Sequence, residues 1–148
     1  MSYKGRFIPS HPEKYVGNIH RIIYRSGWER SVMVKLDRHP GIVQWSSEPM
    51  GIPYVSPLDG RTHKYFPDLW MKVKTKNGDM ETFLVEIKPF RQSVAPNLQD
   101  SFDGRKKKRY LRDSISFAIN NAKWTSARRL CESQKWKFKV WTEKDVQF

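Results

Sequence analysis

Two runs of strand-forming residues, 65–75 and 81–88, are separated by Lys76-Asn77-Gly78. This composition predicts a hairpin, because a glycine can adopt the left-handed backbone that closes a three-residue loop. With that loop the apolar side chains of both strands share one face: Leu69, Met71, Val73, Phe83, Val85 and Ile87. A two-residue loop would instead mix charged and apolar residues on both faces. We therefore expect the longer loop.

The same register brings two carboxylates together. Asp68 is expected directly across from Glu86, with Cβ atoms about 4.5–5.5 Å apart, and Lys88 points to the same side. Two adjacent carboxylates repel each other, which costs roughly 0.2–1 kcal/mol on a strand pair. A divalent cation bound by carboxylate oxygens explains the arrangement, and a neighbouring lysine can stabilise developing negative charge. These residues therefore predict a metal site on the hairpin.

Simpler roles exist for the same residues. Asp68 could be a solvated residue at a strand end, and Glu86 with Lys88 could form a surface ion pair worth about 0–1 kcal/mol. Leu84, Val85 and Ile87 indicate a covered strand, which favours the metal site over the surface pair.

The flanking segments predict the fold class. Ser26 and Glu29 have the spacing of a capping box at a helix start, and His39-Pro40-Gly41 ends that helix. A strand at 42–45 follows, and after it comes a connecting or edge segment with Pro49, Pro53 and Pro57. A loop is expected at 91–104. One or two helices at 105–135, with a break near Asn120-Asn121, and a strand at 136–142 complete the chain. This order predicts an α/β or α+β fold in which helices flank a central mixed β-sheet. We expect one domain, 1–148, with an N-terminal arm at 1–25 and a core at 26–148.

Charge and cysteine content exclude several classes of protein. The chain has 28 Lys and Arg against 15 Asp and Glu, a net charge of +13 and a pI of about 10.0, which favours a nucleic acid as partner. Cys131 is the only cysteine, so an internal disulfide and a multi-cysteine zinc site are excluded. The four histidines have no metal-ligand spacing.

No apolar run is long enough to cross a membrane, and the first residues are too polar for a secretion signal. Cys131 and Trp124 are expected to be buried.

A basic run suggests where DNA would bind. Arg105, Lys106, Lys107, Lys108 and Arg109 open the second helical region, and Lys123 follows in the same region. Such runs are often only solvated helix ends. The functional alternative is contact with phosphates, in which each neutralised phosphate adds about 0.9 to the salt dependence of binding.

The chain resembles the PD-(D/E)xK nuclease superfamily in three features. These are the motif Pro67-Asp68, the later motif Glu86-Ile87-Lys88, and an earlier Glu29 on a helix. The spacing of Ser26 and Glu29 and the segments around both motifs resemble its TnsA-like branch. Over nearly the full length, the flanking aromatic residues are similar to the head-completion nucleases of T-even-like tailed phages.

The resemblance implies a restriction-endonuclease-like core and a nuclease that depends on Mg²⁺ or Mn²⁺. Asp68 and Glu86 would hold the metal, with the Ile87 carbonyl as a further ligand, and Lys88 would assist the attacking water. Glu29, which is a capping residue on the sequence pattern alone, would contact the metal shell. The expected partners are double-stranded DNA and phage head or portal proteins. The nuclease would act in the host cytoplasm or on the virion, before heads and tails join.

Two other functions remain open at this level. A non-catalytic DNA-binding structural protein of the virion would bind DNA without any need for divalent metal. A DNA-cutting subunit of a TnsA-like transposition complex would need a partner for activity, and the chain lacks the C-terminal partner domain expected of such a subunit.

Overall fold

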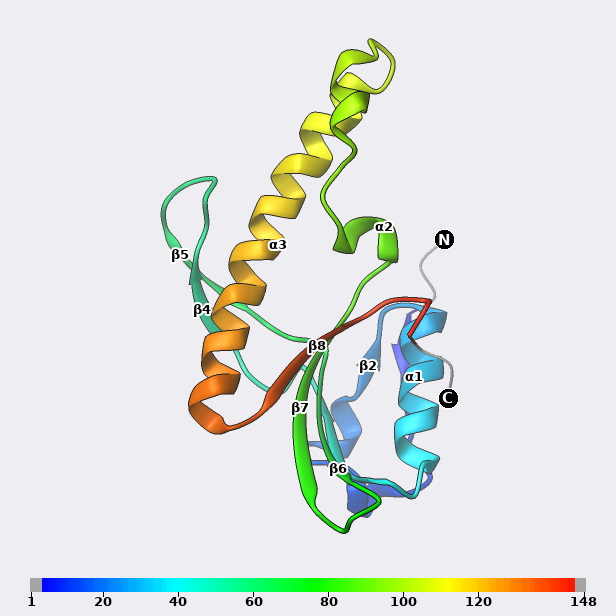
Figure 1. Ribbon diagram of the computed structural model, residues 1–148. Coiled ribbons are helices and arrows are strands. Elements are labelled where there is room, and N and C mark those ends of the chain that lie inside the picture. Colours follow the sequence, from blue (N-terminus) through cyan, green and yellow to red (C-terminus); the bar gives the residue numbers. More distant parts are fainter. Residues whose placement is uncertain (1–3, 146–148) are drawn as a thin grey trace.

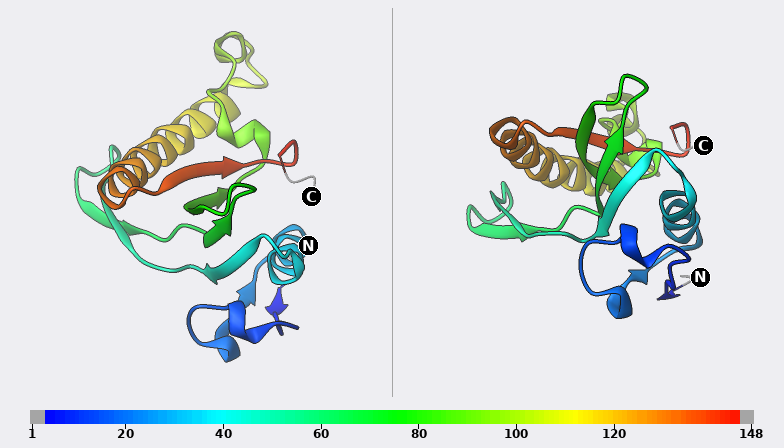
Figure 2. Two further views of the ribbon diagram at one scale, coloured as in Figure 1. Left: turned by 60° about the horizontal axis from the view of Figure 1, so that its bottom comes forward. Right: turned by 90° about the horizontal axis from the view of Figure 1, so that it is seen from below.

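The computed structural model describes residues 4–145, which form a central sheet covered by one long helix on each face (Figures 1 and 2). The sheet order is β3-β6-β7-β8; β3, β6 and β7 are antiparallel and β8 is parallel to β7. The sheet strands and long helices are β3 (Ile42–Ser47), β6 (Leu69–Lys74), β7 (Met80–Ile87), β8 (Lys137–Trp141), α1 (Gly27–Arg38) and α3 (Lys107–Gln134). The predicted mixed α+β architecture is confirmed.

Shorter elements surround this core. They are β1 (Gly5–Arg6), η1 (Pro12–Lys14), η2 (Ile19–Arg21), β2 (Ile23–Tyr24), β4 (Ile52–Val55), β5 (Thr62–Tyr65), α2 (Phe90–Ser93) and η3 (Leu98–Phe102). The strands β1 and β2 form one two-stranded ribbon and β4 and β5 another. Within the described residues no helix has the length and apolar character needed to span a bilayer.

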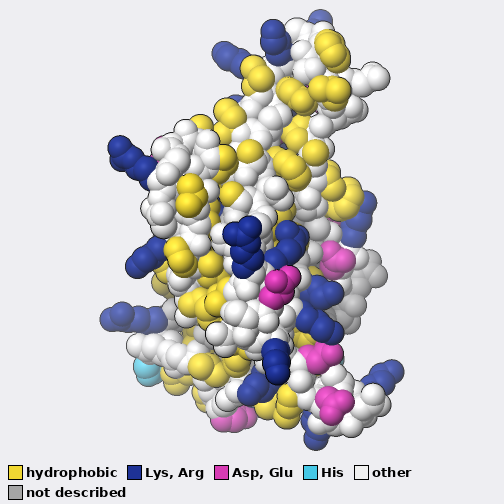
Figure 3. Space-filling model, turned by 60° about the vertical axis from the view of Figure 1, so that its left-hand side comes forward, with side chains coloured by type: hydrophobic (Ala, Val, Ile, Leu, Met, Phe, Trp, Pro, Cys, Tyr) yellow, Lys and Arg dark blue, Asp and Glu magenta, His cyan; other side chains and the backbone are white. Residues whose placement is uncertain are grey.

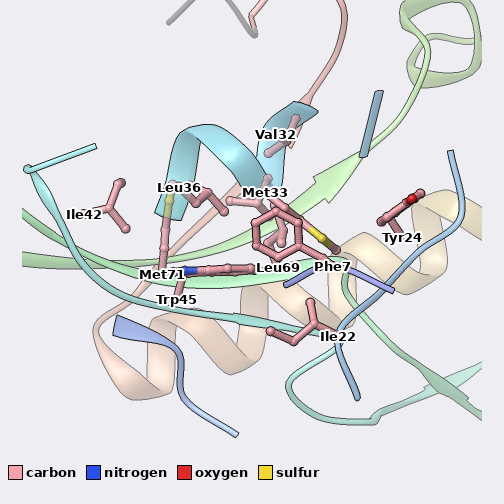
Figure 4. Close-up of a cluster of buried hydrophobic side chains, with 11 residues drawn as sticks. Phe7, Ile22, Tyr24, Val32, Met33, Leu36, Ile42, Trp45, Leu69 and Met71 are labelled. Atoms are coloured by element: carbon pink, nitrogen blue, oxygen red, sulfur yellow. The ribbon is translucent and has the colours of Figure 1, made fainter. Parts of the chain in front are cut away.

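Each face of the sheet has its own apolar core. Figure 4 shows the core under α1, where Val32, Met33 and Leu36 pack against Leu69 and Trp45. On the opposite face α3 packs Trp124, Ala127 and Cys131 against Leu84. The expected burial of Trp124 and Cys131 is confirmed, with exposed fractions of 4% and 2%. Among the polar residues of β6 and β7, Glu86 is buried between these layers, whereas Lys72 and Thr82 are partly exposed.

The register of the hairpin is the one expected from the three-residue loop. Leu69 pairs with Val85 and Met71 pairs with Phe83. Gly78 has a φ of 87°, the left-handed conformation that this loop requires. The clean separation of apolar and polar positions in the sequence therefore specified the pairing.

The predicted strand at 65–75 is wrong in its first part. Tyr65 belongs to β5, which pairs with β4 in a separate ribbon, and β6 begins only at Leu69. Pro67 lies in the break, where its missing N–H cannot contribute to a strand ladder. The expectation for the proline-rich segment is confirmed, since Pro53 lies in that outlying ribbon.

The second helical region also differs in detail from the expectation. α3 is a single continuous helix, and Asn120, near the expected break, is buried within it. The expected loop at 91–104 contains the end of α2 and the short helix η3. Arg105 and Lys106 precede α3 rather than opening it.

The N-terminal residues pack onto α1. Phe7 and Ile22 belong to the core under α1, with exposed fractions of 5% and 0%. Lys14 Nζ donates to the carbonyl oxygens of Leu36, Asp37 and His39 at 2.7, 2.8 and 2.9 Å, which satisfies acceptors at the end of the helix. The division into an arm and a core stays a prediction.

Candidate active site

Asp68 and Glu86 lie side by side at one end of the central hairpin. Asp68 directly precedes β6, and Glu86 is the next-to-last residue of β7, so the Leu69–Val85 pair sets their proximity. Their carboxyl groups interact electrostatically, and the Asp68 carboxylate raises the pKa of Glu86. Asp68 Oδ2 also accepts a hydrogen bond from the Ile87 amide at 2.7 Å, and Glu86 accepts one from the Tyr65 hydroxyl. The two acids predicted from the sequence are therefore together and held in place.

Burial makes this pair hard to ionise fully. Glu86 is only 7% exposed, and burial followed by the nearby Asp68 carboxylate raises the pKa of Glu86 to about 7. Burial also raises the pKa of Asp68, although the Ile87 amide opposes that change. The pair therefore holds a proton up to a higher pH than ordinary carboxyl groups do. A divalent cation suits these oxygen donors, because its charge can replace that proton.

Lys88 provides a cation beside the acids. Its Nζ lies 3.9 Å from Glu86 Oε1, and its side chain is 27% exposed. The Lys88 amide donates to the Trp141 carbonyl at 2.9 Å, so the neighbouring β8 fixes the backbone from which this side chain extends. The ammonium group is thus close to the acids yet accessible from solvent.

Glu29 reaches the same region from the first turn of α1. Ser26 Oγ accepts a hydrogen bond from the Glu29 amide at 3.0 Å, which confirms the predicted cap. The Glu29 carboxylate accepts from the Arg25 amide at 3.3 Å, one residue earlier than a capping box requires. Burial, with a smaller contribution from Asp68, raises the pKa of Glu29. The residue therefore caps the helix and also interacts electrostatically with the acid pair.

Glu48 was not predicted from the sequence. It follows β3, and its amide donates to the Asp68 carbonyl at 2.9 Å, while its carboxylate pairs with the Arg25 guanidinium. Its φ of 47° is unusual for a residue other than glycine. No local pattern marks Glu48; only the pairing of β3 with β6, which joins Ser47 to Leu69, places it beside Asp68.

The described residues contain no group of three or more His, Cys, Asp and Glu side chains arranged to hold a metal ion. Asp68 and Glu86 supply carboxylate oxygens that could hold a metal ion at this site. Ile87 meets the site through its amide, which donates to Asp68. The role of its carbonyl stays a prediction.

Half of the predicted DNA-binding cations line a groove that also includes Lys88. Lys106, Arg109 and Lys123 border this groove of about 760 Å³ between α3 and residues 91–100, and Lys88 lies at its wall. Lys123 Nζ is 5.8 Å from the ring centres of both Tyr54 and Tyr65. Arg105, Lys107 and Lys108 do not line it. Lys and Arg side chains are spread over the face shown in Figure 3, from the protruding helical end to the base.

Two comparisons with known proteins agree with this geometry. The family of TnsA-like endonuclease N-terminal domains matches residues 39–143, a range that includes Asp68, Glu86 and Lys88 and leaves out Glu29. A protein of Enterobacteria phage T4 named head completion nuclease is 34% identical over 143 residues, covering 97% of this chain and 93% of that relative.

Proposed function

Because the chain belongs to the TnsA-like endonuclease family, we propose that it is a phage head-completion nuclease that hydrolyses phosphodiester bonds of double-stranded DNA with Mg²⁺ or Mn²⁺. The observation that carries the proposal is the proximity of Asp68 and Glu86, with Lys88 beside Glu86 and in the wall of a groove lined by several cations. A buried acid pair of this kind is costly for stability, and its chemistry suits a site that holds a cation.

The residues around the acid pair have separate tasks. A divalent ion held by Asp68 and Glu86 would polarise the scissile phosphate and lower the pKa of a water molecule. The Tyr65 hydroxyl and the Ile87 amide orient the two carboxylates. Lys88 places a positive charge where negative charge develops on the phosphate. Glu29 adds a carboxylate on the α1 side of the site, within electrostatic reach of Asp68.

The groove beside α3 is the proposed path of the DNA backbone. Lys106, Arg109 and Lys123 would neutralise phosphates along it and lead the strand to Lys88. Contacts to phosphates carry no direct sequence information, so cleavage with little sequence preference is expected.

The proposed place of action is the newly packaged phage head in the host cytoplasm, where the nuclease would act on packaged DNA in contact with head or portal proteins. The T4 relative's name supports this proposal. Co-sedimentation of the purified protein with DNA-filled heads is the expected result, and its absence at low salt would count against it.

The first prediction concerns cleavage and metal. Purified protein is expected to cleave plasmid DNA in the presence of Mg²⁺ or Mn²⁺ and not in the presence of EDTA. The substitutions Asp68→Ala and Lys88→Ala are each expected to abolish cleavage while DNA binding persists. Agarose gels follow cleavage, and fluorescence anisotropy follows binding. Lys76→Ala in the hairpin loop is the matched control for removal of an exposed lysine and is expected to cleave normally.

The result that overturns this proposal is cleavage at the wild-type rate in EDTA or in Lys88→Ala. If the DNA affinity falls steeply as the salt concentration rises but the protein never cleaves DNA, the result would instead fit a non-catalytic DNA-binding protein of the virion.

A further inference from the structure

A second hollow, of about 560 Å³, is lined by residues that neighbour Asp68 in the chain and in the sheet. Glu48 lines this hollow, and its amide is bonded to the Asp68 carbonyl. Trp70 also lines it from β6, two residues after Asp68. Lys88, in contrast, lies at the wall of the basic groove. Close neighbours of the acid pair therefore line both the groove and this hollow.

The walls of the hollow combine aromatic rings with free hydroxyl groups. Trp70 and Trp136 meet edge to face, with ring centres 6.4 Å apart, and both are partly exposed. Ser46, which is 7% exposed, and Ser47 both contribute to the wall, and neither hydroxyl has a hydrogen-bond partner among residues 4–145. Partly exposed indoles can stack on a base, and free hydroxyls can bond its polar edge.

A positive charge stands at the same hollow. Arg21 lines it, is exposed, and forms no ion pair with any residue in the described part of the chain. An unpaired guanidinium at a pocket rim suits a phosphate oxygen. An aromatic wall, hydrogen-bonding hydroxyls and one free cation together match the base and the phosphate of a single nucleotide.

We propose that the hollow lined by Trp70, Trp136, Ser46 and Arg21 receives one unpaired nucleotide of the strand that is cut. Its volume is within the range of small-ligand pockets, and base pairing would keep a base out of it. A nucleotide must leave the helix to enter, which is least costly where it is already unpaired. The inference rests on the proposed function, and it specifies the substrate class: DNA with an unpaired nucleotide next to the cut, such as an overhang or a frayed end.

The test measures binding without cleavage. Two duplexes of the same sequence, one blunt and one with a short single-stranded overhang, are titrated in EDTA and followed by fluorescence anisotropy. Wild-type protein is expected to bind the overhang duplex about tenfold more tightly, since stacking of one base on an aromatic side chain has effects of this size. Trp136→Ala and Arg21→Ala are each expected to reduce this ratio towards one and to leave blunt-duplex binding unchanged. Trp136→Phe is expected to retain most of it.

Phe102→Ala is the control, because Phe102 is 83% exposed on η3 and does not line the hollow. Arg21→Ala changes an exposed side chain, so it tests the hollow even if Trp136→Ala fails to fold. Equal affinity of the wild-type protein for the two duplexes, or an unchanged ratio in Arg21→Ala, would overturn the inference. Because EDTA prevents metal-dependent cleavage, a protein without nuclease activity could still show the preference, so the two proposals fail separately.

Discussion

At the scale of single residues, Glu86 keeps its proton to a higher pH than an ordinary carboxyl group does. Burial and the neighbouring Asp68 carboxylate raise the pKa of Glu86 from 4.5 to about 7. The folded protein therefore binds more protons than the unfolded chain between these two pH values. Stability contributed by the protonated pair is present at low pH and is lost as the pH rises through about 7.

The second prediction follows from that sign. In EDTA the free energy of unfolding is expected to fall as the pH rises from about 5 to 8, because the folded protein must ionise the buried Glu86 at a cost that the unfolded chain does not have. Glu86→Gln removes one titrating group and is expected to flatten the curve. Urea titrations at several pH values measure this, with Glu81→Gln on the exposed part of β7 as the control. A wild-type curve that rises over this range would contradict the assignment.

At the scale of elements, the hairpin positions the acids. Its register could be predicted because the alternation of apolar residues on 69–73 and 83–87 is a local pattern. Tyr65 and Glu48 could not be assigned to the site in this way. Tyr65 arrives from a separate ribbon, and Glu48 arrives through the pairing of β3 with β6; neither long-range pairing leaves a periodic signal along the chain.

The third prediction tests the hairpin loop. Gly78→Ala is expected to destabilise the protein by about 1–2 kcal/mol, because an L-residue is strained at a φ of 87°. A Cβ atom there would meet nothing within 4 Å, so strain alone causes the effect. Gly104→Ala is the matched control, since a Cβ there also meets nothing and its φ is not positive. Equal stability of the two variants in urea would contradict the loop assignment.

The fourth prediction concerns the end of α1. Lys14→Met keeps much of the aliphatic side chain but removes the ammonium that donates to three carbonyl oxygens. We expect a decrease of about 1.5–3 kcal/mol in the free energy of unfolding, the usual range for hydrogen bonds to a charged group. Thermal denaturation of Lys14→Met and of the exposed-site variant Lys4→Met measures the difference. A decrease no larger than that of Lys4→Met would contradict the capping role.

At the scale of the whole molecule, a net charge of +13 predicts DNA binding but not where the DNA lies. The run 105–109 could not be resolved further from the sequence, because neighbouring helical residues face different directions. The structure separates this run: Lys106 and Arg109 line the groove with Lys123, whereas Arg105, Lys107 and Lys108 do not.

The fifth prediction uses this separation. A triple alanine variant at Lys106, Arg109 and Lys123 is expected to lower the salt dependence of DNA binding by about 0.9 for each phosphate that the variant no longer neutralises. A second triple variant at Arg105, Lys107 and Lys108 removes the same charge and is expected to change it less. Anisotropy titrations from low to moderate salt give both slopes. Equal slopes would show that net charge, rather than the groove, governs binding.

The most direct test of the central claim is calorimetric titration of Mn²⁺ into the wild-type protein and into Asp68→Asn and Glu86→Gln at about pH 8, where the acid pair is most readily ionised. The wild-type protein is expected to bind Mn²⁺ saturably, and each variant is expected to bind it at least about tenfold more weakly. Undiminished Mn²⁺ binding by both variants would contradict this claim.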